Sequence, residues 1–171
     1  PPPASAFYAT FHVAIFDTVN SITRTHRGWI NPAPAPAGTD LNAAIASASF
    51  TVLNALWGQA ANPRNFQVAY EQALAVIADG PGKADGVAWG KKVAEAVLAA
   101  RATSGFDKPI PGQYASTDPG KWRETPPGFR PPVLPHWRKV TPFAMTSPEQ
   151  FRAPPPPAVD SPAQAEDLAY I

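Results

Sequence analysis

Three polar residues interrupt an otherwise apolar segment near the start of the chain: His12, Asp17 and Asn20. Imidazole and carboxylate groups can bind metals or transfer protons. On a helix, positions 12 and 17 point about 140° apart, because each residue turns the helix by about 100°. One metal ion cannot easily use both, so a buried, hydrogen-bonded histidine or a capped aspartate is expected in preference to a catalytic role.

A second group of chemically capable residues is basic. It comprises Arg123, Arg130, His136, Arg138 and Lys139, with Trp122 and Trp137 between them. Guanidinium groups suit phosphate-like oxyanions, so this group could face an anionic ligand. The favoured alternative is that Arg and Trp side chains stack within a proline-rich segment, with the charges at the surface. His136, Arg138 and Lys139 are the candidates for a pocket rim, and no residue is assigned a catalytic, cofactor-binding or metal-binding role.

The part of the chain before Gly105 predicts four helices, because apolar residues recur there at steps of three and four. Their expected ranges are 4–23, 41–57, 63–79 and 83–103. Short loops between them predict antiparallel neighbours. Thr39 or Asp40 is expected to cap the second helix, and the many alanines of this helix favour close packing. The buried stripe of the first helix is expected at Phe7, Phe11, Ala14 or Ile15, Val19 and Ile22; Lys91, Lys92, Glu95 and Arg101 of the fourth are expected to face outward.

The composition changes at Gly105, and fifteen of the 23 prolines follow it. Residues 105–160 are expected to form a Pro-rich wrap across the helical layer of residues 1–104, with buried aromatic side chains. Runs such as 126–132 and 154–157 resemble ligands of proline-binding modules, but the apolar residues between them favour an ordered internal wrap. Ser161 and Pro162 begin a fifth helix, of which residues 161–171 are the truncated start. The prediction is a single all-α unit of antiparallel helices, itself part of a larger helical-bundle enzyme.

Length, charge and composition limit the functions that the chain could have. A chain of 171 residues is the size of one domain. A net charge of +1 argues against nucleic-acid binding, and no window is apolar enough to predict membrane insertion. Without cysteine there is no disulfide, zinc-thiolate site or thiol nucleophile. Sequence signatures of nucleotide-binding loops, serine hydrolases and zinc proteases are absent from the sequence.

Three stretches together resemble a known family. They are HVAIFDTVNSI, ADGPGKADGVAWGKKVAEAVLAARATSG and PGKWRETPPGFRPPVLPHWRKVTPFAMTSPEQFRAPPPPAV. Together they resemble the N-terminal half of bacterial vanadium-dependent haloperoxidase-like proteins, relatives of the type 2 phosphatidic acid phosphatases. The resemblance implies an all-α fold in which this half supplies outer helices and a wrap to a second bundle.

The resemblance also implies where the chemistry lies. Family members bind vanadate, or phosphate in the phosphatases, through Lys, Arg, a Ser-Gly-His stretch and a further Arg and His in the C-terminal half. This sequence has no Ser-Gly-His, so none of those positions is placed on a residue here. The expectation is an enzyme that oxidises halide with hydrogen peroxide and holds vanadate only when complete.

The expected partner is the C-terminal half of the same protein or a companion chain, because the sequence starts without Met and ends inside a predicted helix. By itself the chain is expected to be inactive. The alternatives are a portion of a related acid phosphatase and a non-catalytic binding or assembly subunit. Since relatives are often exported, the resemblance favours a periplasmic or extracellular location.

Overall fold

The computed structural model describes residues 2–31, 33–58, 65–108 and 116–171, and over these ranges the protein is all-helical without a β-strand. The α-helices are α1 (Pro2–Thr23), α2 (Leu41–Trp57), α3 (Gln67–Ala75), α4 (Pro81–Arg101) and α5 (Pro162–Tyr170), and a short 3₁₀-helix, η1, spans Pro135–Lys139. The predicted all-α class is confirmed. None of the described helices has the length and apolarity needed to cross a lipid bilayer.

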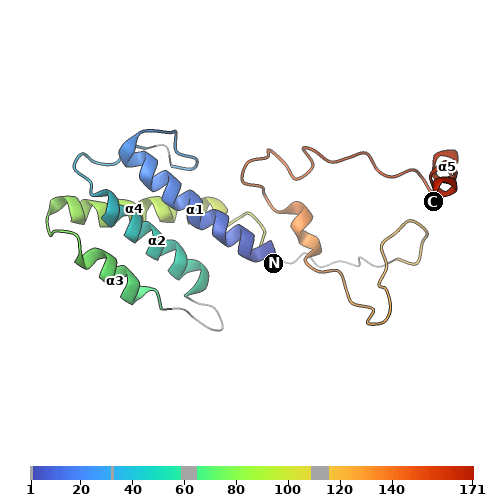
Figure 1. Ribbon diagram of the computed structural model, residues 1–171, viewed down its shortest axis with the longest axis horizontal. Helices are drawn as coiled ribbons and strands as arrows, with labels where there is room; N and C mark the ends of the chain where they lie inside the picture. Colours follow the sequence, from blue (N-terminus) through green and yellow to red (C-terminus); the bar gives the residue numbers. More distant parts are fainter. Residues whose placement is uncertain (1, 32, 59–64, 109–115) are drawn as a thin grey trace. The chain divides into compact units, whose positions relative to one another are not determined.

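The chain forms two compact units, residues 1–104 and 105–171 (Figure 1). The first, the helical layer, contains α1 to α4. The second contains the Pro-rich segment, residues 105–160, followed by α5. The boundary between the units coincides with the change in proline content at Gly105.

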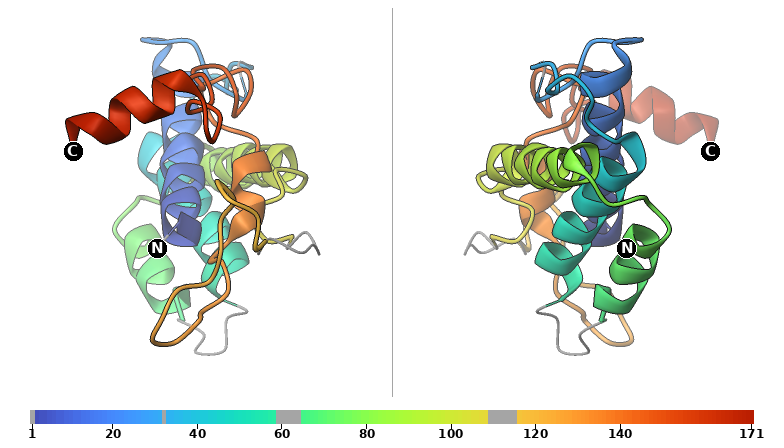
Figure 2. Two further views of the ribbon diagram at one scale, coloured as in Figure 1. Left: turned by 90° about the vertical axis from the view of Figure 1, so that its right-hand side faces the viewer. Right: turned by 90° about the vertical axis from the view of Figure 1, so that its left-hand side faces the viewer.

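Within the helical layer, α2 packs most extensively against α4, α1 crosses both, and α3 lies against α2 (Figures 1 and 2). The core where α1, α2 and α4 meet is built from small side chains: Ala14, Ala48, Val52, Ala94 and Val97. Larger apolar side chains such as Phe11 and Leu56 only partly bury against it. Small core residues allow the helix axes to approach closely, and they leave most of the larger side chains near the surface.

Glycines of α4 set the close approach to α2. A Cβ on Gly86 would lie 2.6 Å from the Asp40 carbonyl oxygen, and one on Gly90 would overlap the Ala44 carbonyl. The Ser47 hydroxyl donates to the Val87 carbonyl at 2.7 Å across this contact. The predicted close packing by alanines of α2 is confirmed by the complete burial of Ala44 and its neighbour Ala43.

Helix starts follow the expected capping chemistry. Asp40 Oδ1 accepts a hydrogen bond from the Ala43 N–H at 2.8 Å, which confirms the predicted cap of α2. At α5, the Ser161 hydroxyl accepts from the Gln164 N–H at 3.2 Å, and Pro162 occupies the first turn. These two starts could be located from residue types alone.

Several helix boundaries differ from the predicted ranges: α1 begins at Pro2 rather than at residue 4, and α4 spans Pro81–Arg101 rather than 83–103. The Gly-Pro-Gly sequence at 80–82, expected to separate the helices, instead begins α4, since proline tolerates the first helical turn where its missing N–H has no partner to lose. α3 ends at Ala75 rather than Asp79. Its predicted start at Asn62 and Pro63 lies outside the described residues.

The predicted buried face of α1 was wrong. The buried side of α1 is lined by Ala6, Thr10, Ala14, Asp17, Thr18, Asn20 and Ser21, so only Ala14 belongs to the predicted stripe. Periodicity could not select this face because large apolar residues occur around most of the helix. On α4, Lys91, Lys92 and Glu95 are exposed as predicted, and the prediction was wrong for Arg101 alone among the four. Arg101, expected to face outward, is 7% exposed, and burial lowers the pKa of its guanidinium below the ordinary value.

The Pro-rich segment leaves three of its aromatic side chains exposed, while Phe106, Trp137 and Phe143 are half-buried. Trp122, Phe129 and Phe151 are 47%, 57% and 78% exposed, so the prediction that the aromatics of this segment are buried is wrong for these three. Turns predominate, with Phe129 and Leu134 in the left-handed region of backbone space. Among the described residues of the second unit, His136 alone is buried.

Candidate functional site

The three predicted rim residues lie on η1 but do not converge. His136 is buried, and its Nε2 lies 3.1 Å from the Phe106 carbonyl oxygen. A carbonyl oxygen only accepts, so Nε2 carries the proton and donates it there. Arg138 and Lys139 are exposed, and neither forms an ion pair within the described part of the chain. His136 is therefore engaged with the backbone while the two cations face solvent.

Asp17 has a structural role. Its carboxylate is fully buried and accepts hydrogen bonds from three successive backbone N–H groups, those of Trp29, Ile30 and Asn31. The last two bonds are 2.8 Å long. The expected capped aspartate is confirmed, although the capped backbone belongs to the loop after α1 and not to a helix.

His12 and Asn20 take separate roles on α1. Asn20 Oδ1 accepts from the Thr25 hydroxyl and from the His26 N–H, both at 3.0 Å, so its side chain secures the same loop. His12 is exposed, and the prediction that it is buried was wrong. The structure does not bring His12, Asp17 and Asn20 together as one site.

A cavity of about 390 Å³ lies in the Pro-rich segment, close in sequence to the predicted rim residues. It is lined by Trp122, Arg123, Thr125, Pro126, Pro127, Gly128 and Arg130. Two arginines of the predicted basic group therefore share a cavity. Sequence reasoning identified both arginines but did not anticipate that the intervening turn would bring them to one cavity without His136, Arg138 or Lys139 in its lining.

A second cavity, of about 570 Å³, is an apolar groove on the outer side of α1. Its lining residues are His12, Val13, Ile15, Phe16, Val19, Asn20 and Trp29. Trp29 is 54% exposed and Phe16 39%. Sequence reasoning missed this groove because Trp29 lies between the predicted helices 4–23 and 41–57, whereas Asp17 fixes the backbone of Trp29 beside α1.

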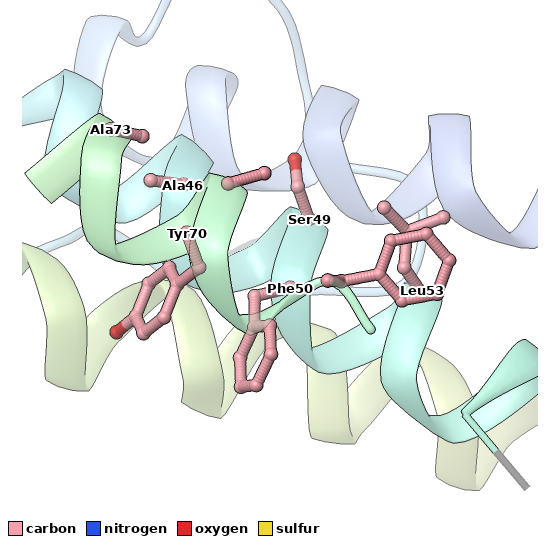
Figure 3. Close-up of a pocket in the computed structure, with 8 residues that line it drawn as sticks. Ala46, Ser49, Phe50, Leu53, Tyr70 and Ala73 are labelled. Atoms are coloured by element: carbon pink, nitrogen blue, oxygen red, sulfur yellow. The ribbon is translucent and has the colours of Figure 1, made fainter. Parts of the chain in front are cut away.

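A third cavity, of about 250 Å³, separates α2 from α3 (Figure 3). The rings of Phe50 and Tyr70 stack with centroids 4.5 Å apart, and alanines of both helices complete much of the wall. No residue of α3 is buried. The lining carries no charged group. We therefore interpret this cavity as loose packing between two helices and not as a catalytic or ligand-binding site.

The vanadate implied by the family resemblance does not fit the donors brought together here. Such a site combines several cationic donors with an imidazole at the metal centre. The arginine cavity supplies guanidinium groups without an imidazole in its lining, and His136 is committed to the Phe106 carbonyl. Over the described ranges, no three His, Asp or Glu residues gather as a metal-binding group.

Comparison of the chain with protein-family models, with curated proteins and with solved structures finds no match.

Proposed function

We propose that residues 1–171 are the N-terminal structural portion of a vanadium-dependent haloperoxidase-like enzyme, which oxidises halide with hydrogen peroxide. In this proposal the oxyanion site and its vanadate belong to a C-terminal half of the same protein or to a companion chain. The sequence resemblance suggests the family. The observation that carries the structural role is the apolar outer face of α1.

The outer side of α1 is largely apolar, whereas its buried side is lined mainly by small and polar residues. Asp17 is its one charged residue, and that carboxylate is buried. Its outer face presents the groove formed with Trp29, where Phe16 is exposed. Large exposed apolar patches mark interaction surfaces. This face supports the docking of a second helical bundle.

The Pro-rich segment supports the same role. Its exposed side chains include Phe129, Val133, Phe151, Leu168 and Tyr170 when α5 is counted with it. Aromatic residues are enriched in the cores of interfaces because they bury a large area at small entropic cost. These residues would anchor the segment on a partner surface.

An activity measurement tests the catalytic part of the proposal. The purified 171-residue chain, supplied with vanadate, bromide and hydrogen peroxide, should show no bromide oxidation, and addition of the C-terminal half or companion chain should restore it. Turnover by the purified chain would overturn the proposal. An assembly that hydrolyses phosphate esters without oxidising bromide would support the phosphatase alternative.

A docking measurement tests the structural part. Phe16→Glu places a charge in the α1 groove, and we expect it to weaken association with the C-terminal half or companion chain by at least about tenfold. Val76→Glu is the matched control, because Val76 is 86% exposed on a different part of the helical layer. Equal affinity of the two variants for that partner would contradict docking at α1.

The exposed apolar surfaces also favour a second candidate, a non-catalytic binding or assembly subunit. Both candidates predict docking at α1, so the activity of the assembled protein separates them. A stable complex in which neither bromide oxidation nor phosphate-ester hydrolysis appears would favour the assembly subunit.

A further inference from the structure

A tight turn in the Pro-rich segment brings two arginines, seven positions apart in the sequence, to one cavity. The Phe129 N–H donates to the Thr125 carbonyl at 3.0 Å, and Phe129 adopts a left-handed φ of 42°. This reversal closes the chain between Arg123 and Arg130, and both line the resulting cavity of about 390 Å³.

Gly128 provides the surface on which Arg130 rests. A Cβ placed on Gly128 would lie 3.6 Å from Arg130 Cγ and 3.7 Å from its Nε, which are ordinary van der Waals distances. The arginine stem therefore lies along the turn, with its Nε close to the backbone. Gly128 and Arg130 both line the cavity.

The cavity has an uncompensated positive charge. Its lining contains two guanidinium groups and no carboxylate, and neither arginine has an ion-pair partner in the described part of the chain. In the same segment, Arg152 pairs with Glu149 at 3.3 Å. Two neighbouring cations without a counter-ion favour an anion, and guanidinium forks match the oxygens of a phosphate group.

The remaining lining residues indicate which chemical group a bound anion would carry. The Trp122 ring and the rings of Pro126 and Pro127 form apolar walls, and Thr125 adds a hydroxyl donor. We propose that this cavity binds a phosphate monoester of a flat, apolar group, with Arg123 and Arg130 on the phosphate and Trp122 against the apolar part. A phosphate monoester carries close to two negative charges at pH 7.5, since its second pKa is about 6. The ligand charge then balances the two arginines.

A titration of the intact chain tests this site. Phenyl phosphate is the probe, and the arginine Nε–Hε signals in nitrogen-15 NMR spectra are the readout. We expect saturable shifts at Arg123 and Arg130, and affinity about three- to tenfold higher than for inorganic phosphate because the ring contacts Trp122. Phenol, which lacks the phosphate, should not shift these signals. Equal affinity for phenyl phosphate and inorganic phosphate would overturn the role given to Trp122.

Substitutions assign the site. Arg123→Gln and Arg130→Gln should each lower the affinity for phenyl phosphate about tenfold, as expected when a charge-assisted hydrogen bond is lost. Arg138→Gln is the matched control, an exposed arginine of the same segment that does not line the cavity. Equal loss in all three variants would overturn the proposal in favour of diffuse charge attraction.

The unmodified chain provides a result that does not depend on the folding of a variant. Absence of saturable shifts at Arg123 and Arg130 up to millimolar phenyl phosphate would refute the site directly. This inference rests on the cavity alone, so its failure leaves the proposed docking role of α1 untouched, and failure of bromide oxidation leaves this site untouched.

Discussion

Asp17 organises the loop after α1 through a single carboxylate. Its donors are the N–H groups of residues twelve to fourteen positions later in the sequence. A buried carboxylate that accepts hydrogen bonds from several N–H groups has its negative charge stabilised by them. It also provides the acceptors that the backbone of an irregular loop would otherwise lack. Asn20 supports the next part of that loop through Thr25 and His26. Two side chains of one helix thus order a connection that contains several prolines.

Asp17→Asn should destabilise the helical layer. The amide retains the size of the carboxylate but loses one acceptor oxygen and the negative charge, so at least one buried N–H loses its partner, at a cost of about 2 kcal/mol. Chemical denaturation should show this loss. Hydrogen exchange at Ile30 and Asn31, whose N–H groups are bonded to Asp17, should accelerate.

Asp40→Asn serves as the control for that substitution. Asp40 caps α2 with one oxygen, and asparagine caps a helix about as well as aspartate, so the change should cost only a few tenths of a kcal/mol. Similar destabilisation by both substitutions would contradict the anchoring role of Asp17.

The capped state of Asp17 could be predicted from the sequence. The loop N–H groups that donate to it could not, because they depend on the path of residues 24–31.

At the scale of elements, the contact between α2 and α4 depends on glycines spaced four residues apart. Gly82, Gly86 and Gly90 repeat along α4 on one face. Each meets a backbone carbonyl of the segment that begins α2: those of Gly38, Asp40 and Ala44. The sequence displayed this spacing, but helical periodicity was assigned from large apolar residues, so a face formed by the absence of side chains was missed.

Alanine substitution along this face should give a graded loss of stability. Alanine favours the helix by about 1 kcal/mol over glycine at an interior position, while overpacking costs about 1–3 kcal/mol. At Gly90 the added methyl would overlap the rigid backbone of α2, so Gly90→Ala should be the most destabilising. Gly82→Ala should be the mildest, because its neighbour is the carbonyl of Gly38 in a loop, 2.7 Å away, which can move. Thermal unfolding of the three variants checks the order, and equal effects would contradict a close helix crossing.

The connection between α3 and α4 is held by a pH-sensitive ion pair. Lys83 Nζ lies 2.8 Å from Asp79 Oδ1 and donates to the Ile77 carbonyl at 3.1 Å. The hydrogen bond and the positive charge of Lys83 hold the pKa of Asp79 below its ordinary value. A lowered acid pKa means that the pair stabilises the fold above the unfolded-state value of about 3.9 and that this stabilisation is lost as the pH falls through the folded-state pKa.

A double-mutant cycle with Asp79→Asn and Lys83→Met should therefore show favourable coupling at pH 7 that disappears in strongly acidic solution. The coupling should be small, because the Asp79 side chain is 95% exposed and solvent screens it. Unfolding free energies from urea titration at several pH values provide the measurement. Coupling that persists after Asp79 is protonated would show that the pair acts through packing of the Lys83 stem instead.

At the scale of the whole molecule, buried apolar residues are concentrated in one unit. Every buried hydrophobic residue of the described core lies between Ala6 and Val97. Composition predicted a structural change at Gly105. It did not predict that the buried hydrophobic residues of the described core would all lie before that residue. Proline and aromatic content predicted an ordered wrap across the helical layer with buried aromatic side chains, but Phe129 and Phe151 are exposed. Burial of these two side chains depends on a partner surface, and no periodicity within the segment encodes that surface.

The distribution of buried residues predicts that the helical layer governs cooperative unfolding. A chain ending at Ser104 should retain the helical circular-dichroism signal of α1 to α4, with a urea midpoint close to that of the 171-residue chain. The urea m-value scales with the surface exposed on unfolding, so it should be nearly the same for both chains if the second unit contributes little buried area.

Fluorescence of the second unit provides an independent measurement. Changes in the fluorescence intensity of Trp122 and Trp137, measured in a chain with the other tryptophans replaced by phenylalanine, should occur at lower urea concentration than the helical transition. A single coincident transition for all probes, with an m-value that falls when residues 105–171 are removed, would contradict this division and show that the two units fold as one.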